Sequence, residues 1–105
     1  MPTLTVRNVP LKVVQSLKAL ANRHRLMVLC ELHKGEHSVT KLQEAVGLSQ
    51  SSLSQHLARL REDRLVKTRR ESQTIYYSLA TRNVSELIGL LYRLYCAPAQ
   101  GPKLS

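Results

Sequence analysis

The chain has 105 residues, 16 Lys and Arg against 7 Asp and Glu, and a formal net charge of +9. This length predicts one domain, residues 1–105, with an ordered core over about 9–97 and a disordered tail at 98–105. The charge favours a polyanionic partner, no apolar run approaches the roughly 20 residues that span a bilayer, and the N-terminus lacks signal-peptide features. We therefore expect a cytoplasmic protein without a membrane partner.

Four helices are predicted in the first part of the chain, because apolar residues recur there at helical spacing. Residues typical of helix boundaries separate them: Pro10, Asn22, Gly35, Ser38, Gly47 and Ser49. Pro10 suits a first helical turn, Asn22 an N-cap, and Gly47 a left-handed C-cap. Ser38 and Ser49 are the expected N-caps of the third and fourth helices.

A two-stranded hairpin with a basic tip is predicted after the fourth helix. Residues 65–70 and 74–79 are rich in Val, Thr, Ile and Tyr, and Glu71, Ser72 and Gln73 separate them. The fold class is therefore mainly helical with a small β-hairpin.

A last helix is predicted to begin at Asn83 or Ser85, to reach about Cys96, and to stop at Ala97-Pro98. Apolar residues cover most of its circumference: Val84, Leu87, Ile88, Leu90, Leu91, Tyr92, Leu94 and Tyr95. Such a helix is buried on more than one side. In so small a chain we expect the second cover to be another subunit, in a twofold dimer formed through the first and last helices.

The fourth helix carries the most informative pattern. Leu53, Leu57 and Leu60 form an apolar stripe, and the opposite face carries short, neutral or basic groups: Ser51, Gln55, Ala58 and Arg59. A helix that buries leucines and exposes hydroxyl, amide and guanidinium groups suits the base edges of a DNA major groove.

From Val9 to Cys96 the chain resembles the ArsR/SmtB family of bacterial repressors. The resemblance rests on LKALANRHRL near the start, SVTKLQEAVGLSQSSLSQHL in the centre and LVKTRRESQTIYYSL in the hairpin. It implies a winged helix-turn-helix, in which the hairpin is the wing. It also implies a homodimer that binds palindromic double-stranded operator DNA and leaves it when an inducer acts.

The expected DNA-contacting residues lie on the fourth helix and at the wing. They are Gln50, Ser51, Ser54, Gln55, His56, Arg59, Arg69, Arg70 and Gln73. Glutamine can pair bidentately with adenine, and serine hydroxyls and helix N-terminal amides can hold phosphate. Some serines have the alternative role of capping or solvating the helix. His56 lies on the flank of the leucine stripe, where packing or an internal hydrogen bond is at least as strong an expectation.

Arg64 departs from the family pattern, which usually has Gly between the fourth helix and the wing. If the turn keeps a left-handed residue there, Arg costs on the order of 1 kcal/mol. The alternative is a locally different turn.

The family's metal-ligand patterns are missing, and we predict no metal or other cofactor. There is no Cys between residues 38 and 47, and the last helix has only Glu86 among the usual ligand types. A zinc or copper site of Cys30, His33 and Cys96 is the alternative, and it needs ligands that no motif supplies.

The two cysteines, Cys30 and Cys96, are the candidate sensing residues. Taken alone, each cysteine is more typical of a small buried apolar residue than of a sensing thiol. Their contexts VLCEL and LYCAP resemble the persulfide-sensing SqrR/BigR branch of the family. That resemblance implies an inorganic or low-molecular-weight persulfide as inducer and a di- or polysulfide crosslink. General thiol oxidation and metal sensing are the alternatives, whereas an enzymatic oxidoreductase is disfavoured because no C-x-x-C or nucleophile–base motif is present.

Overall fold

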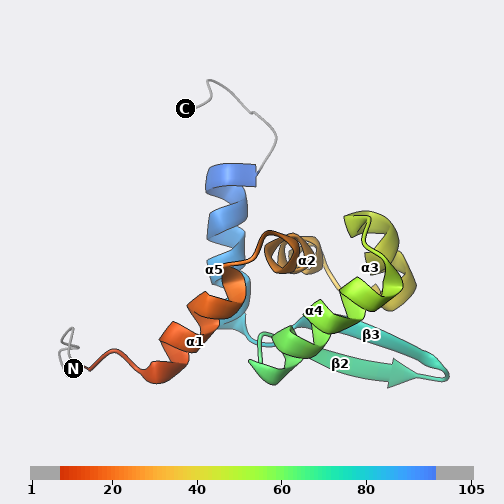
Figure 1. Ribbon diagram of the computed structural model, residues 1–105, viewed down its shortest axis with the longest axis horizontal. Coiled ribbons are helices and arrows are strands. Elements are labelled where there is room, and N and C mark those ends of the chain that lie inside the picture. Colours follow the sequence, from red (N-terminus) through yellow and green to blue (C-terminus); the bar gives the residue numbers. More distant parts are fainter. Residues whose placement is uncertain (1–7, 97–105) are drawn as a thin grey trace.

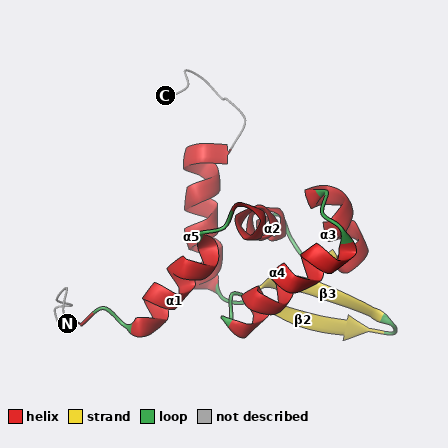
Figure 2. Cartoon of the chain, in the orientation of Figure 1, coloured by secondary structure: helices red, strands yellow, loops and turns green. Residues whose placement is uncertain are grey.

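The computed structural model describes residues 8–96, and the predicted tail and its Ala97-Pro98 helix stop lie outside them. Within this range, helices pack beside a small sheet whose two long strands project to one side as a wing (Figures 1 and 2). The predicted fold class and element order are confirmed, with one added short strand. No helix within residues 8–96 is long and apolar enough to cross a membrane.

The four predicted N-terminal helices all form. They are α1 (Leu11–Leu20), α2 (Arg23–His33), α3 (Val39–Val46) and α4 (Gln50–Glu62). Asn22 caps α2 by accepting from the backbone N–H groups of His24 and Arg25, each at 3.0 Å. The Ser38 and Ser49 hydroxyls cap α3 and α4 in the same way, and Gly47 closes α3 with φ of 70°.

The predicted start of the last helix was wrong by one to three residues. Helix α5 spans Arg82–Leu91, and its N-cap is Thr81, whose hydroxyl accepts from the Val84 N–H at 3.2 Å. Ser85 N instead bonds to the Thr81 carbonyl, so it already belongs to the first turn. A π-helical segment, η2 (Tyr92–Cys96), continues α5 to the predicted end.

The sheet has three strands rather than the predicted two. A short β1 (His37–Ser38) pairs with β3 (Thr74–Leu79), which also pairs with β2 (Val66–Glu71), giving the order β1-β3-β2 with antiparallel neighbours. Two residues are too few to show the period-2 alternation by which strands are recognised. The third strand therefore joins the wing to the segment between α2 and α3.

The core is aliphatic, as a chain without Trp or Phe requires. Its largest fully buried side chains come from α2, α3, α4 and α5, and they are Val28, Leu29, Leu42, Leu53, Leu60 and Ile88. The predicted α4 stripe is confirmed, because Leu53, Leu57 and Leu60 are all at most 2% exposed. Burying this stripe fixes which face of α4 remains outside.

The turn after α4 keeps its left-handed residue despite the Arg at that position. Arg64 has φ of 61°, its N–H donates to the Arg61 carbonyl, and the Leu65 N–H donates to the Leu60 carbonyl at 2.9 Å. These two bonds form a Schellman motif, which normally carries Gly at the left-handed position. The first of the two expectations for Arg64 is therefore confirmed.

Replacing Arg64 with Gly is expected to raise the free energy of unfolding by up to about 1 kcal/mol, because relief of the left-handed strain exceeds the entropic cost of Gly. Urea unfolding of wild type and variant measures the change. Arg61→Gly, which removes the same charge from a right-handed position in the last turn of α4, is the matched control and is expected to lower stability by up to about 1 kcal/mol. A loss of stability in Arg64→Gly would contradict the assigned strain.

Candidate nucleic-acid interface and thiol site

Helix α4 presents a polar face on the side opposite its buried leucines. The predicted contact residues Gln50, Ser51, Ser54 and Gln55 are all exposed in its first two turns. Because Ser49 occupies only the Ser52 N–H, other amides at the helix N-terminus remain available to an anion. This face therefore offers neutral hydrogen-bonding groups beside a positively polarised helix end.

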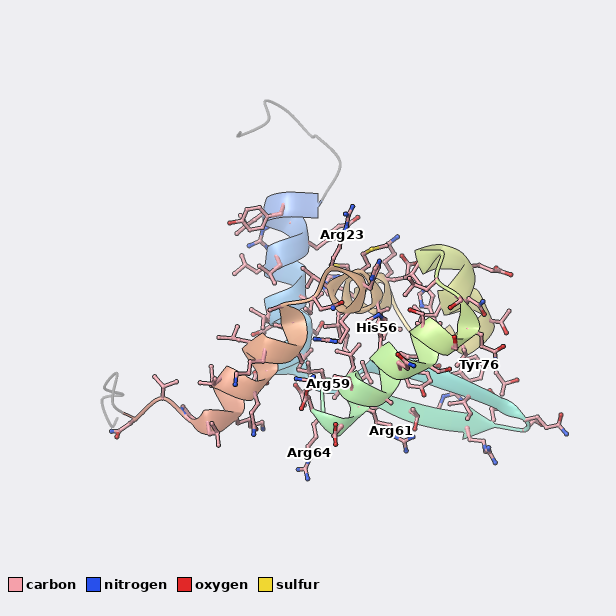
Figure 3. The ribbon with its side chains drawn as sticks, viewed as in Figure 1. Arg23, His56, Arg59, Arg61, Arg64 and Tyr76 are labelled. Carbon is pink, nitrogen blue, oxygen red and sulfur yellow. The ribbon has the colours of Figure 1, made fainter. Side chains whose placement is uncertain are left out.

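A surface groove of about 410 Å³ runs between α4 and the wing. Ser54, Ala58 and Arg61 line it from α4, and Tyr77 lines it from β3. Arg61 is exposed and lies over the wing (Figure 3). The sequence reading named Arg59 but missed Arg61, although its helical position beside Ser54 and Ala58 was available as a signal.

Strand alternation separates the two wing arginines. Tyr77 lies against the α4 groove and pairs with Thr68, so Thr68 and Arg70 share the α4 side of the sheet. Arg69 pairs with Tyr76 and lies on the opposite side. Arg70 is exposed near the wing tip, where Ser72, with φ of 57°, and the exposed Gln73 form the turn.

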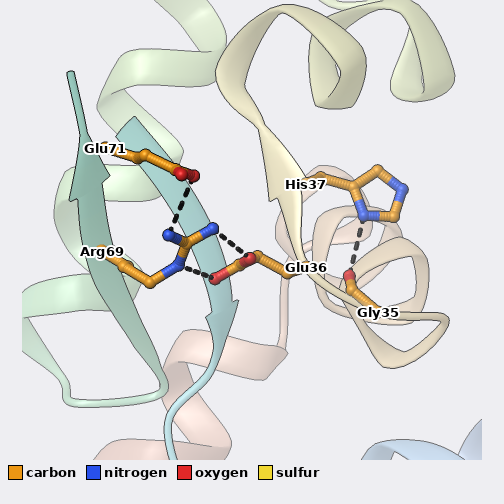
Figure 4. A network of polar contacts seen from close by, with 5 residues as sticks. All are labelled: Gly35, Glu36, His37, Arg69 and Glu71. Carbon is orange, nitrogen blue, oxygen red and sulfur yellow. Dashed lines mark hydrogen bonds and ion pairs between the residues drawn. The ribbon is translucent and has the colours of Figure 1, made fainter. Parts of the chain in front are cut away.

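The guanidinium of Arg69 is held by carboxylates rather than directed into solvent. Its Nε and Nη2 atoms donate to Glu36 at 3.0 and 2.8 Å, and Nη1 donates to Glu71 at 3.1 Å (Figure 4). It also lies 4.6 Å from the centre of the Tyr76 ring. Its hydrogen bonds to Glu36 first, and then to Glu71, raise the pKa of Arg69, and the same guanidinium lowers the pKa of Glu36.

Arg59 is also paired. Its Nε donates to the Asp63 carboxylate at 2.7 Å, an i,i+4 contact at the end of α4. Two of the three arginines that the sequence predicted at DNA, Arg59 and Arg69, thus hold acidic partners. Other exposed cations beside the groove and wing are Arg61, Arg64, Lys67 and Arg70.

His56 lies between α4 and the start of α2 rather than on the outer face of α4 (Figure 3). Its ring centre is 5.7 Å from that of His24, and it is half-buried. Burial first, and then the charges of Arg25 and His24, lower the pKa of His56. This position supports the packing role that was weighed against DNA contact.

Cys30 lines a second groove, of about 400 Å³, between α2, α3 and η2. The thiol is half-buried, with Leu26, Met27 and Val46 among the apolar walls. Tyr92, four positions before Cys96, lines the same groove. The beginning of η2 therefore adjoins the thiol site, while the side chain of Cys96 lies outside the part of the chain that the structure describes.

Charged groups border the same groove. Glu31 bridges Lys34 and His37, with its two oxygens 3.1 Å from Lys34 Nζ and His37 Nε2. Burial opposes ionisation of Glu31, but the hydrogen bonds from Lys34 and His37 outweigh it and lower the pKa of the carboxyl. Among the described side chains, no group of three or more His, Cys, Asp or Glu is placed to hold a metal ion.

The sequence profile described as "Bacterial regulatory protein, arsR family" matches residues 22–68. The transcriptional activator HlyU of Vibrio cholerae is 53% identical over 89 residues, which cover 85% of this chain and 82% of HlyU. The chain belongs to the ArsR family. The matching family and relatives are transcriptional regulators, which confirms the prediction that the protein is a regulator rather than an enzyme.

Further relatives agree in sequence and fold. The biofilm growth-associated repressor of Xylella fastidiosa (strain 9a5c) is 41% identical over 82% of this chain and 75% of its own length. Reduced HlyU from Vibrio cholerae superposes with a TM-score of 0.79 at 53% identity, covering 83% of this ArsR-family chain and 92% of that structure. The homodimeric winged helix-turn-helix domain of Mb0332 from Mycobacterium bovis gives 0.75 at 33% identity, with 90% and 89% coverage.

The lowered pKa of His56 predicts that acid destabilises the fold. The unfolded chain, where the His pKa is near 6.5, binds the proton more readily than the folded protein, so stability is lost as the pH falls through that value. Urea unfolding at pH 7.5 and 5.5 is expected to show a smaller loss in His56→Gln than in wild type. An equal loss in both proteins would contradict this role.

Proposed function

We propose that the protein is a homodimeric repressor that binds palindromic operator DNA and releases it when persulfide or polysulfide crosslinks Cys30 to Cys96. The observation that carries DNA binding is the outer face of α4, which is polar and exposed because the leucine stripe is buried. In a twofold dimer, two such faces would enter major grooves about 34 Å apart. A regulator of this kind acts on DNA, so we expect it in the bacterial cytoplasm.

In this proposal the contact residues fall into two groups. Gln50, Ser51, Ser54 and Gln55 contact base edges and phosphates from the start of α4. Arg61 and Arg70 contact phosphates from the two sides of the α4–wing groove, with Gln73 at the tip. Arg59, Arg69 and His56 support the interface indirectly rather than by contacting DNA. Arg59 and Arg69 are paired with Asp63 and Glu36, and His56 packs beside α2.

Dimerisation is supported by apolar side chains that a lone subunit leaves in water. On and beside α1 they are Val9, Leu11, Val13, Val14 and Leu17, and on α5 and η2 they are Leu87, Leu90, Leu94 and Tyr95. Leu11 is 69% exposed and Tyr95 76%. Contiguous apolar surface of this kind marks an interface, and the relative Mb0332 is a homodimer.

The sensing chemistry needs only the two thiols and the inducer. A Cys30 thiolate attacks an inner sulfur of a polysulfide, forms an S–S bond and displaces a shorter polysulfide or hydrosulfide. The Cys96 thiolate then attacks the chain on Cys30 and displaces a second hydrosulfide, which closes the bridge. The thiols lose two electrons and the polysulfide sulfur gains them.

The groove around Cys30 supports this proposal. It gives the thiol partial access to solvent, and Tyr92 brings the start of η2 to the same groove. Lys34 borders it, and a nearby cation favours the thiolate. The relative HlyU has been solved in a form specified as reduced.

For DNA binding, Gln55→Ala is expected to weaken operator binding by about 1–3 kcal/mol while leaving non-specific binding unchanged, because it removes a base contact. Arg70→Ala is expected to weaken both kinds of binding and to reduce the slope of log K against log salt by about 1. Fluorescence anisotropy at several salt concentrations measures both effects.

Arg93→Ala is the matched control, since Arg93 is exposed on η2, away from the wing (Figure 1). It removes the same charge and is expected to leave the salt slope nearly unchanged. Equal effects of Arg70→Ala and Arg93→Ala, or DNA binding that is insensitive to salt, would contradict the proposed interface.

For sensing, polysulfide is expected to raise the operator Kd of the wild type by about tenfold or more, within the range of allosteric couplings. Cys30→Ser and Cys96→Ser are each expected to abolish this response. Intact-mass analysis alongside anisotropy is expected to show added sulfur between the cysteines, removable with dithiothreitol.

Other outcomes identify the alternatives. A plain disulfide and equal release with peroxide would favour a general thiol-oxidation sensor. Release by zinc without covalent change would favour a metal sensor. Release by polysulfide in either serine variant would contradict the two-cysteine mechanism.

A further inference from the structure

Two consecutive residues at β1 reach in opposite directions. Glu36, just before β1, accepts two hydrogen bonds from Arg69 of β2. His37 is buried, and its ring nitrogens face the Gly35 carbonyl at 2.8 Å and the Glu31 carboxylate at 3.1 Å. Side chains of neighbouring strand residues alternate between faces, so one short strand can join two separate contacts.

The His37 contact leads to the thiol site. Glu31 directly follows Cys30 on α2 and lines the same groove, together with Lys34. A displacement of α2 at Cys30 therefore moves the carboxylate that holds His37. Because His37 pairs with Tyr77 in the sheet, this displacement also acts on β3.

The Glu36 contact leads to the wing. Arg69 lies over the Tyr76 ring of β3, and its guanidinium donates to Glu36 (Figure 4), so its side chain reaches from β2 across β3 to the residue just before β1. Glu71 holds the same guanidinium, but it lies on β2 itself. Glu36 therefore ties the wing to the α2–α3 segment, whereas Glu71 only ties β2 to itself.

We propose that Glu36 and His37 couple the Cys30 groove to the wing, with Arg69 as the positioning residue that fixes the wing's angle. The exposed Glu36–Arg69 ion pair contributes little to stability, but it fixes the relative orientation of strands that backbone hydrogen bonds already pair. This inference rests on the proposed function for its biological meaning. Its structural content is a link from α2 to β2 through β1.

Glu36→Gln is expected to lower the ratio of operator Kd after and before polysulfide by about threefold or more, the size of effect seen along coupling paths. Glu71→Gln is the matched control, because it removes the same charge and one Arg69 ion pair without touching the β1 link. Its ratio is expected to equal that of the wild type, and intact mass is expected to show equal cysteine modification in all three. Equal ratios in Glu36→Gln and wild type would overturn the proposal.

Variants of His37 test the part of the link that joins α2 to β1. Asn in its place can still donate to the Gly35 carbonyl but falls short of Glu31, whereas Gln can reach toward Glu31. His37→Asn is expected to lower the Kd ratio by about threefold or more, and His37→Gln to retain more of it. Thermal unfolding of both variants identifies any effect that comes from loss of folding alone. A ratio retained in folded His37→Asn would overturn this half of the link.

A second readout does not depend on DNA release. In Cys96→Ser protein labelled with ¹⁵N, iodoacetamide modification of Cys30 is expected to shift the amide signals of Arg69 and Tyr76. Adding Glu36→Gln is expected to abolish these shifts, and adding Glu71→Gln to keep them. Shifts that persist with Glu36→Gln, or are absent with Glu36 intact, would overturn the link. If wild-type protein fails to release the operator after polysulfide while these shifts are present in the Cys96→Ser protein, only the proposed sensing function is overturned.

Discussion

Burial of the α4 leucine stripe is the packing constraint on which the other functional features depend. With Leu53 and Leu60 fully enclosed, the helix has one rotation about its axis that satisfies the core, and its polar face must point outward. The Schellman closure after α4 then sets the direction in which the chain leaves for β2. The polar face of α4 and the wing are thus fixed relative to each other by the same few side chains and two backbone bonds.

Local sequence patterns predicted most of the fold because the signals act over three or four residues. The caps at Asn22, Ser38 and Ser49 and the left-handed Gly47 are of this kind, as is the apolar spacing on α4. Where several capping residues lie close together, as at Thr81, Asn83 and Ser85, composition does not select one. The structure selects Thr81 because the Ala80 N–H, bonded to the Leu65 carbonyl, extends the sheet to that point.

The site was less predictable, because its key contacts join residues far apart in the chain. No local pattern near Arg69 predicts its contact with Glu36, which lies 33 positions earlier in the chain. The hydrogen bonds between them hold the guanidinium against a carboxylate instead of leaving it available to phosphate. Arg61 was missed although its helical spacing from Ser54 and Ala58 is a local signal. Its place in the groove is apparent only once Tyr77 of β3 is known to lie across from it. An arginine in the sequence suggests a phosphate contact by its charge alone. Its neighbours in the fold, a carboxylate or an aromatic ring, determine whether the guanidinium is available to a phosphate.

The continuity of α5 and η2 has a consequence for how the protein responds to its own abundance. One uninterrupted helical segment carries apolar residues exposed in a lone subunit, such as Leu90 and Leu94, and ends at Cys96. In the proposed dimer, burial of that apolar surface by a second copy would hold in place the segment that ends at Cys96, the second proposed sensing residue. Under this proposal, dilution would weaken subunit pairing and the placement of Cys96 together, so that a cell making little of the protein would have a regulator that is both less assembled and less ready to react.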